Sequence, residues 1–227
     1  MSNTIGLLIS KNWGALLKIK SYFYRITFQQ FLIKVNSKKN IRYLEIGPGE
    51  TRIPGFETAN IVKNKNTDYV FDATKNLSFP NNTFDIVYAS HILEHVPWYQ
   101  VEKTLEEWSR IIKVGGRLEI WVPDALKIAK AFCGGEDSGS LEYQKDGWYR
   151  FNEEKDVAKW FSGRMFSYGD GMGTRGHFNY HLSAFSERYL IKLMKSQGFV
   201  DITKMKRSSC RGADHGWINL GIRGTKK

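Results

Sequence analysis

Apolar side chains recur with helical spacing near the start of the chain. Between residues 14 and 35 they are separated by seven, four, three and four positions, at Leu17, Tyr24, Phe28, Phe31 and Val35. This spacing places them on one face of a helix. We therefore predict an amphipathic helix within an N-terminal arm of residues 1–40, followed by a domain of residues 41–227.

Short apolar runs follow at residue 41 and alternate with helical patterns. The runs cover residues 41–46, 56–61, 68–73, 84–90 and 117–124. Most are continuous rather than alternating, which is typical of parallel strands buried on both faces. This alternation predicts an α/β fold, a three-layer sandwich in which helices cover both faces of a mostly parallel sheet.

Two helices are predicted within this pattern. Residues 98–113 place four apolar side chains on one face, Val101, Leu105, Trp108 and Ile112. The segment "KVGG" is expected to end this helix, because Gly115 and Gly116 permit the turn that a helix C-terminus requires. The second helix spans residues 186–197, with Ser186 as its N-cap.

The last two strands are expected to be antiparallel neighbours. "FVDITKMK" and "GWINLGIRG" are strand-like runs joined by a polar loop. They complete a predicted sheet of seven strands. Between the fifth strand and the last helix, residues 125–180 break the pattern with glycines, charges and many aromatic residues, and we interpret them as a lid-like insert.

Charge is concentrated at the N-terminus. The net charge of the chain is +11, and residues 1–40 contain seven basic residues and no acidic residue. They are Lys11, Lys18, Lys20, Arg25, Lys34, Lys38 and Lys39. A basic amphipathic helix can bind an anionic membrane surface, whereas the alternative is a helix packed on the domain with its lysines in water.

The composition is that of a globular protein in a reducing compartment. The chain has no apolar run long enough for a transmembrane helix, and its N-terminal apolar stretch is broken by Lys11 and Asn12. Two cysteines are too few for a disulfide framework or a zinc site. We expect a cytoplasmic protein, peripheral to the inner face of the membrane if the arm binds lipid, and we predict no metal site.

The stretch "YLEIGPGETRIPGF" contains the first candidate for ligand binding. Gly47 and Gly49 follow the first strand, and ligands of parallel sheets bind beyond the carboxyl ends of the strands. The third glycine of a dinucleotide fingerprint is replaced by Arg52. Glu45 is poorly suited to phosphates and well suited to a cationic amino acid moiety.

In this context the sequence resembles class I S-adenosylmethionine (SAM) dependent methyltransferases, including those of surface-glycan synthesis. The resemblance covers residues 41–227 and is strongest in "EIGPG", "FPNNTFDIVYASHILEH" and "GGRLEIWVPD". It implies a Rossmann-like methyltransferase fold with SAM as cofactor and S-adenosylhomocysteine as product. The implied cofactor residues are Glu45, Gly47, Pro48, Gly49, Asn60, Asp72, Ala73, Ser90 and His91.

Each of these positions has an implied role. Glu45 would lie near the amino acid end of SAM, and Asp72 would accept a hydrogen bond from the adenine amino group. Asn60 stands where the family usually has an acidic residue that binds the ribose hydroxyls. This departure weakens the expected ribose contact, because an amide oxygen lacks the charge that strengthens a hydrogen bond.

The candidate catalytic residues come from three segments. A hydroxyl acceptor needs a general base, and histidine is the usual one near neutral pH. His181, His91 and Asp124 are the candidates, with His181 preferred. Glu94 and His95 are interpreted as packing or capping groups.

The acceptor is the least defined part of the prediction. The motif of DNA-base amino-methyltransferases is replaced after the fourth strand by "ASHILEH", so we expect no DNA substrate. We expect O-methylation of a sugar, sugar nucleotide or glycan precursor, and Arg150, Arg164 and Arg175 would suit an anionic group on it. Two alternatives remain open: a lipid or RNA methyltransferase anchored by the arm, and a non-catalytic SAM-binding module.

Overall fold

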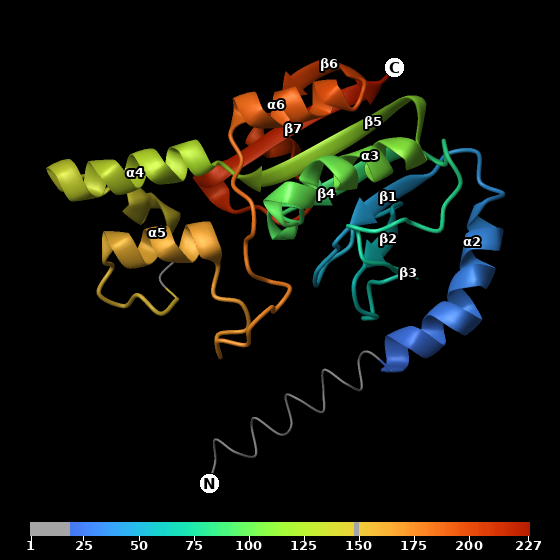
Figure 1. Cartoon of the computed structure of the whole chain (residues 1–227), viewed down its shortest axis with the longest axis horizontal. Helices are drawn as coiled ribbons and strands as arrows, with labels where there is room; N and C mark the ends of the chain where they lie inside the picture. Colours follow the sequence, from blue (N-terminus) through green and yellow to red (C-terminus); the bar gives the residue numbers. More distant parts are fainter. Residues whose placement is uncertain (1–18, 148–149) are drawn as a thin grey trace, which may run out of the picture.

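A single seven-stranded sheet organises the chain (Figure 1). The computed structural model describes residues 19–147 and 150–227. The strands are β1 (Tyr43–Ile46), β2 (Glu57–Asn60), β3 (Tyr69–Val70), β4 (Phe84–Ser90), β5 (Ile112–Pro123), β6 (Phe199–Lys204) and β7 (Asn219–Lys226). Their order is β3-β2-β1-β4-β5-β7-β6. Strand order therefore reverses between β1 and β4, the place where such sheets bind ligands.

The directions of the strands match the expected α/β class. The first five strands are mutually parallel, and β7 is antiparallel to both β5 and β6. The predictions of a mostly parallel sheet and of an antiparallel last pair are thus confirmed.

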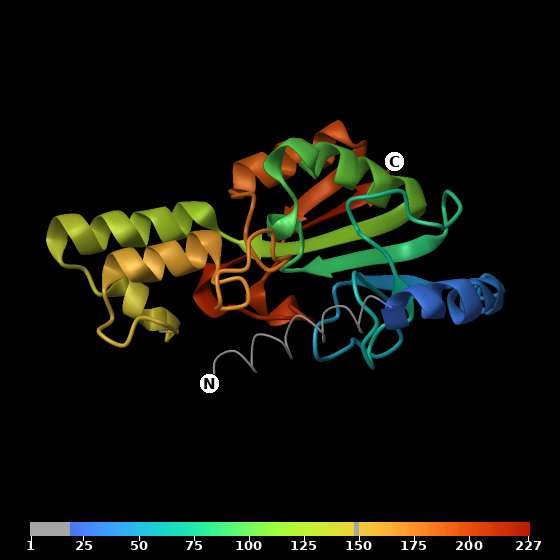
Figure 2. The same ribbon diagram turned by 60° about the horizontal axis from the view of Figure 1, so that its bottom comes forward.

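Two helices cover one face of the sheet, as both views show (Figures 1 and 2). They are α3 (Val101–Ile111) and α6 (Glu187–Ser196), and the Ser186 side chain caps α6 as predicted. Leu105 and Trp108 of α3 and Leu190 of α6 are fully buried in the main core. On the opposite face, Ile53, Phe56 and Met205 pack against β4 and β5 from segments outside the α-helices.

The expected end of α3 at "KVGG" is wrong. The helix stops at Ile111, and Ile112 already pairs with Phe84 of β4. A Cβ on Gly116 would lie 2.9 Å from the Lys113 carbonyl oxygen and 3.0 Å from that of Asp85. The glycines therefore permit a bulge at the start of β5 rather than the turn after a helix.

The N-terminal helix packs against the edge strand β3. Within the described residues it runs from residue 19 through a π-helical turn, η1 (Arg25–Gln29), into α2 (Gln30–Asn36). The Gln29 side chain accepts a hydrogen bond from the Val70 backbone N–H (2.8 Å). Asn36 donates to the Tyr69 hydroxyl (2.6 Å), which donates to Glu57. The helix thus covers an exposed sheet edge with polar contacts.

The predicted apolar face of this helix is not the face that packs. Leu17 lies outside the described residues, and Tyr24 is half-buried. Phe28 and Phe31 are each 63% exposed, and Val35 is also exposed. Leu32 and Ile33 contact the core instead, since the π-helical turn inserts an extra residue and rotates the face.

The remaining elements form an extension at one end of the sheet. Helices α4 (Ala125–Ser138) and α5 (Val157–Phe166) lie side by side beyond β5 in both views (Figures 1 and 2). They share a small core with Trp160 at its centre. Short helical turns are η2 (Leu93–His95), η3 (Trp98–Gln100), η4 (Glu142–Asp146), η5 (Arg207–Ser209) and η6 (Gly216–Ile218).

Candidate active site

A cavity of about 1060 Å³ opens at the carboxyl ends of the parallel strands. Its position at the strand-order reversal is the one expected for the ligand of an open α/β sheet. Eight of the residues predicted for the site line it: Gly47, Gly49, Asn60, Asp72, Ala73, Ser90, His91 and His181. The insert contributes to the same wall through Arg164, Tyr168 and Phe178.

The glycines after β1 adopt a backbone conformation that few other residues tolerate. Gly47 and Gly49 have φ angles of +73° and +59°. A Cβ on Gly47 would lie 1.9 Å from a side-chain carbon of Ile92, so Gly47 is required for packing. A Cβ on Gly49 would meet nothing within 4 Å, so Gly49 leaves space at the cavity wall.

Polar groups at the ends of β2 and β3 line the adjacent wall. Asn60 Oδ1 accepts from the Ile61 backbone N–H (2.9 Å). Asp72 Oδ1 accepts from the backbone and the hydroxyl of Thr74 (3.0 and 2.6 Å). These hydrogen bonds fix Oδ1 of the Asp72 carboxylate in the turn. The other oxygen, Oδ2, lies 3.6 Å from Lys75 Nζ.

Glu45 and Asp124 do not line the cavity. Glu45 is buried, and burial raises the pKa of its carboxyl group, although the Ile53 backbone N–H donates to Oε2 (2.8 Å) and opposes this shift. Asp124 is the N-cap of α4 and accepts from the Lys127 N–H (3.2 Å). The expectation that His91 and Asp124 flank one pocket is therefore wrong, because the helix start uses the carboxylate. Pro48 is buried and likewise outside the cavity wall.

Ser90 and His91 end β4 in positions set by hydrogen bonds. Ser90 Oγ donates to the Ala213 carbonyl (2.8 Å). His91 has a φ of +54°, a strained value for a residue with a side chain. Its Nδ1 lies 3.0 Å from Glu94 Oε1, and its Nε2 lies 3.0 Å from Asn219 Oδ1. Contacts with oxygen atoms at both ring nitrogens hold the His91 ring in place.

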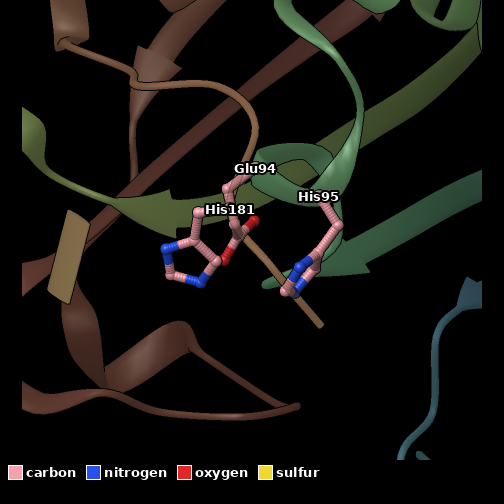
Figure 3. A group of neighbouring side chains, drawn as sticks. All are labelled: Glu94, His95 and His181. Atoms are coloured by element: carbon pink, nitrogen blue, oxygen red, sulfur yellow. The ribbon is translucent and has the colours of Figure 1, made fainter. Parts of the chain in front are cut away.

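Three side chains meet at the mouth of β4 (Figure 3). Glu94 and His95 belong to η2, and His181 comes from the end of the insert. The Leu182 and Ser183 backbone N–H groups both donate to the Glu94 carbonyl, which fixes the loop on η2. The His95 and His181 ring centroids are 5.0 Å apart, and the Glu94 carboxylate lies between the rings.

The electrostatics of this cluster favour an ionised Glu94 and neutral His181 and His215 rings. Burial raises the pKa of Glu94, but the hydrogen bond from His91 and the neighbouring imidazoles lower it to about 2. Burial lowers the pKa of His181. Burial and the stacked His91 ring lower the pKa of His215 to about 3.

Sequence reasoning missed part of this site. Glu94 and His95 had been interpreted as packing or capping groups, and His215 and Arg207 had not been considered. The signal was present in "HILEH", since histidine, glutamate and histidine at positions 91, 94 and 95 fall on one side of a helical turn. His215 comes from a loop after β6, and no local pattern indicates its contact with His91.

Comparisons with known proteins agree with this location. Residues 44–120 match the family described as the methyltransferase domain. This segment contains β1 to β4, the glycines and η2, and so most of the strand ends around the cavity. A comparison with curated proteins found no match.

Solved structures give distant similarities. A SAM-dependent methyltransferase from Thermotoga maritima, described as a possible histamine N-methyltransferase, is 21% identical and gives a TM-score of 0.43. The alignment covers 92% of this chain and 96% of that one. A SAM-dependent methyltransferase from Archaeoglobus fulgidus is 16% identical over 94% of this chain and 100% of its own, with a TM-score of 0.45.

A third structure, the methyltransferase CalH in complex with S-adenosylhomocysteine, is 14% identical and gives a TM-score of 0.46. That alignment covers 88% of this chain and 54% of CalH.

The residues of the cavity fit SAM. Gly49 leaves space beside the end of β1, and Asn60 and Asp72 offer polar groups at the ends of the next two strands. The cavity volume of about 1060 Å³ lies slightly above the range of about 300–1,000 Å³ that is typical of ligand pockets, which suits a cofactor and an acceptor together. Residues 44–120 thus match a methyltransferase domain, and the cavity at their strand ends is where its cofactor, SAM, would bind.

Proposed function

We propose that this methyltransferase methylates a hydroxyl oxygen of a sugar, sugar nucleotide or glycan precursor. The observation that carries the proposal is the placement of His181 on the cavity wall. His181 Nδ1 lies 3.1 Å from the Arg164 carbonyl oxygen, which can only accept a hydrogen bond. Nδ1 therefore carries the hydrogen, and Nε2 retains a lone pair for the proton of an acceptor hydroxyl.

The reaction needs only an in-line displacement. When bound, SAM supplies an electrophilic methyl group on a sulfonium sulfur. The acceptor oxygen must lie about 3 Å from that methyl group, opposite the sulfur. His181 would take the hydroxyl proton as the acceptor oxygen bonds to the methyl carbon, and the sulfur would keep the electron pair of the broken carbon–sulfur bond and leave as S-adenosylhomocysteine. His91 acts as a positioning residue, since both of its nitrogens are engaged.

Basic side chains on the cavity wall support an acceptor with negative charge. Arg164 and Arg207 line the cavity, and Arg207 Nε pairs with Asp214 (2.9 Å), whereas Arg150 stacks on Tyr168 and Arg175 is exposed. A guanidinium binds phosphate or carboxylate with two parallel hydrogen bonds. This favours a sugar nucleotide or a phosphorylated glycan precursor over a neutral sugar.

The test is transfer of a labelled methyl group from SAM to panels of acceptors. Sugar nucleotides and phosphorylated sugars are expected to take up label in an ether that resists mild alkali. Label in phospholipid or RNA would instead support the alternative acceptors. SAM binding without transfer to any panel would favour the non-catalytic module.

Asn60 gives a separate prediction about the cofactor. If Asn60 binds the ribose hydroxyls, Asn60→Asp should tighten SAM binding by about 1 kcal/mol, because a charged acceptor forms the stronger hydrogen bond. Calorimetric titration of SAM measures the change. Equal or weaker binding would mean that another group meets the ribose.

We further propose that the N-terminal helix contacts an anionic membrane surface. Ile19, Tyr22, Phe23, Phe28, Phe31 and Val35 are exposed on it. Lys20, Arg25, Lys34, Lys38 and Lys39 accompany them, without any acidic residue in the first 40 positions. Apolar side chains flanked by basic ones suit a surface of anionic lipid. Within the described ranges, none of the helices is long and apolar enough to cross a membrane.

Vesicle binding should therefore depend on exposed aromatic residues of this helix. The double variant Phe28→Ser, Phe31→Ser is expected to bind anionic vesicles at least about tenfold more weakly, since the burial of each ring contributes free energy. Cosedimentation measures the loss, and retention should fall with salt. The matched control is Trp98→Ser, Tyr99→Ser, which removes two exposed rings outside the helix. Equal loss in both variants, or no binding of the wild-type chain, would contradict the proposal.

A further inference from the structure

We propose that Glu94, His95 and His181 bind a divalent transition-metal ion. Each of the three residues offers one ligand atom, and these atoms all lie within 4.8 Å of one another. They come from two segments far apart in sequence that backbone hydrogen bonds hold together. All three residues line the cavity at the end of β4, so an ion there would face the space that holds the acceptor (Figure 3).

The Glu94 carboxylate provides the first reason. It is 1% exposed, and its Oε1 is paired with His91 Nδ1. Its Oε2 is buried and has no hydrogen-bond partner among the described residues. A buried oxygen without a partner costs free energy unless an ion, a water molecule or a ligand satisfies it. A metal ion between the two imidazole rings would do so.

The two histidines are oriented as metal ligands usually are. His95 Nδ1 lies 3.2 Å from the Tyr180 carbonyl oxygen, and His181 Nδ1 lies 3.1 Å from that of Arg164. Both carbonyl groups accept, so both Nδ1 atoms carry hydrogen and both Nε2 atoms keep a lone pair. Metal-binding histidines are typically held in this way by a second hydrogen bond from the other ring nitrogen.

The carboxylate is supported in the same manner. His91 donates to Glu94 Oε1 and is itself fixed by Asn219, whose amide donates to Asp214 (2.7 Å). The strained backbone of His91 places its ring in this position. The chain thus supplies three candidate ligands and a supporting hydrogen bond for each of them.

The donor set selects the kind of ion. Two imidazoles and one carboxylate favour Zn²⁺, Mn²⁺, Fe²⁺ or Co²⁺ over Mg²⁺ and Ca²⁺, which prefer oxygen ligands. Three protein ligands leave at least one coordination position open for an oxygen of the acceptor. The ion would lower the pKa of an acceptor hydroxyl that reaches it. His181 would then be a metal ligand, and the hydroxyl proton would pass to solvent. The role of the ion in catalysis rests on the proposed function, whereas binding of the ion does not.

The experiment is titration of the full chain, stripped with chelator, with Zn²⁺ and with Co²⁺ in the absence of SAM. We expect one equivalent to bind, with a visible Co²⁺ spectrum typical of nitrogen and oxygen ligands. His95→Ala, His181→Ala and Glu94→Gln should each weaken binding by at least about 100-fold, since loss of supporting residues alone costs about 10–100-fold. The control His177→Ala removes a half-buried histidine outside the cavity wall and should bind as the wild type does.

Two readouts separate this inference from the proposed function. Thermal unfolding of the metal-free variants identifies any variant that fails to fold. If a histidine variant fails to fold, Glu94→Gln still tests the site, because glutamine has nearly the same shape as glutamate. The metal site would be overturned if the wild-type chain bound neither Zn²⁺ nor Co²⁺. It would also be overturned if all three ligand variants bound these ions as tightly as the wild type does. Because the titration uses no SAM or acceptor, failure of methyl transfer with intact metal binding would overturn only the proposed function.

Discussion

Replacing Gly49 by valine is expected to abolish SAM binding while leaving the fold in place. The added side chain would meet no protein atom near its Cβ, so the variant need not disturb packing. Gly49 lines the cavity beside the end of β1, where the backbone must approach the cofactor closely. The valine would therefore occupy space that SAM needs. Calorimetric titration should show no binding at SAM concentrations that saturate the wild type.

The control variant must introduce the same backbone strain at a glycine that does not line the cavity. Gly139 has a φ of +65°, and its Cβ would also meet nothing within 4 Å, but it ends α4 away from the cavity wall. Gly139→Val should cost about the 1–2 kcal/mol of a left-handed residue and should bind SAM normally. Undiminished affinity in Gly49→Val would move the cofactor site away from the glycines.

Much of the fold could be predicted because its signals are local. The fourth strand was predicted at its observed bounds, residues 84–90, since its continuous apolar run is typical of a strand buried on both faces. Ser186 caps α6 through a bond to the Tyr189 N–H, three residues away. Signals of this kind lie within a few residues and need no knowledge of the rest of the chain.

The errors concern features that depend on distant contacts. The N-terminal helix was predicted, but its packed face was not, because a π-helical turn changed the phase and because Gln29 and Asn36 bind β3. The glycines of "KVGG" form a bulge because the Asp85 carbonyl oxygen of the neighbouring strand lies close to Gly116, where a Cβ would be 3.0 Å from it. Neither effect is visible in hydrophobic periodicity.

The candidate site divides in the same way. Residues at or just after the carboxyl ends of strands, such as Gly49, Asn60 and Asp72, could be placed at the cavity because parallel strands end at a common edge. Asp124 also follows a strand, but α4 begins there and takes its carboxylate as a cap. The cluster of Glu94, His95 and His181 required knowledge of how the insert returns to η2, which no spacing along the chain provides.

Loss of the His181 imidazole is expected to lower turnover by about 10²- to 10⁴-fold, with SAM affinity nearly unchanged. This is the usual range for removal of a general base. The ring contacts Glu94 and His95 at the end of the cavity formed by η2 and the insert, whereas SAM is expected along the ends of β1, β2 and β3. His181→Ala should therefore reduce kcat without a matching change in the dissociation constant of SAM.

Two further variants determine what such a loss would mean. Asp124→Asn retains a good helix cap and alters no group on the cavity wall, so it should keep near-native turnover. His91→Ala should lower turnover through Glu94, which would lose its hydrogen bond with the His91 ring. If His181→Ala retained the wild-type rate, the acceptor would be a nucleophile that is already ionised, such as a phosphate or carboxylate oxygen, and hydroxyl methylation would have to be abandoned.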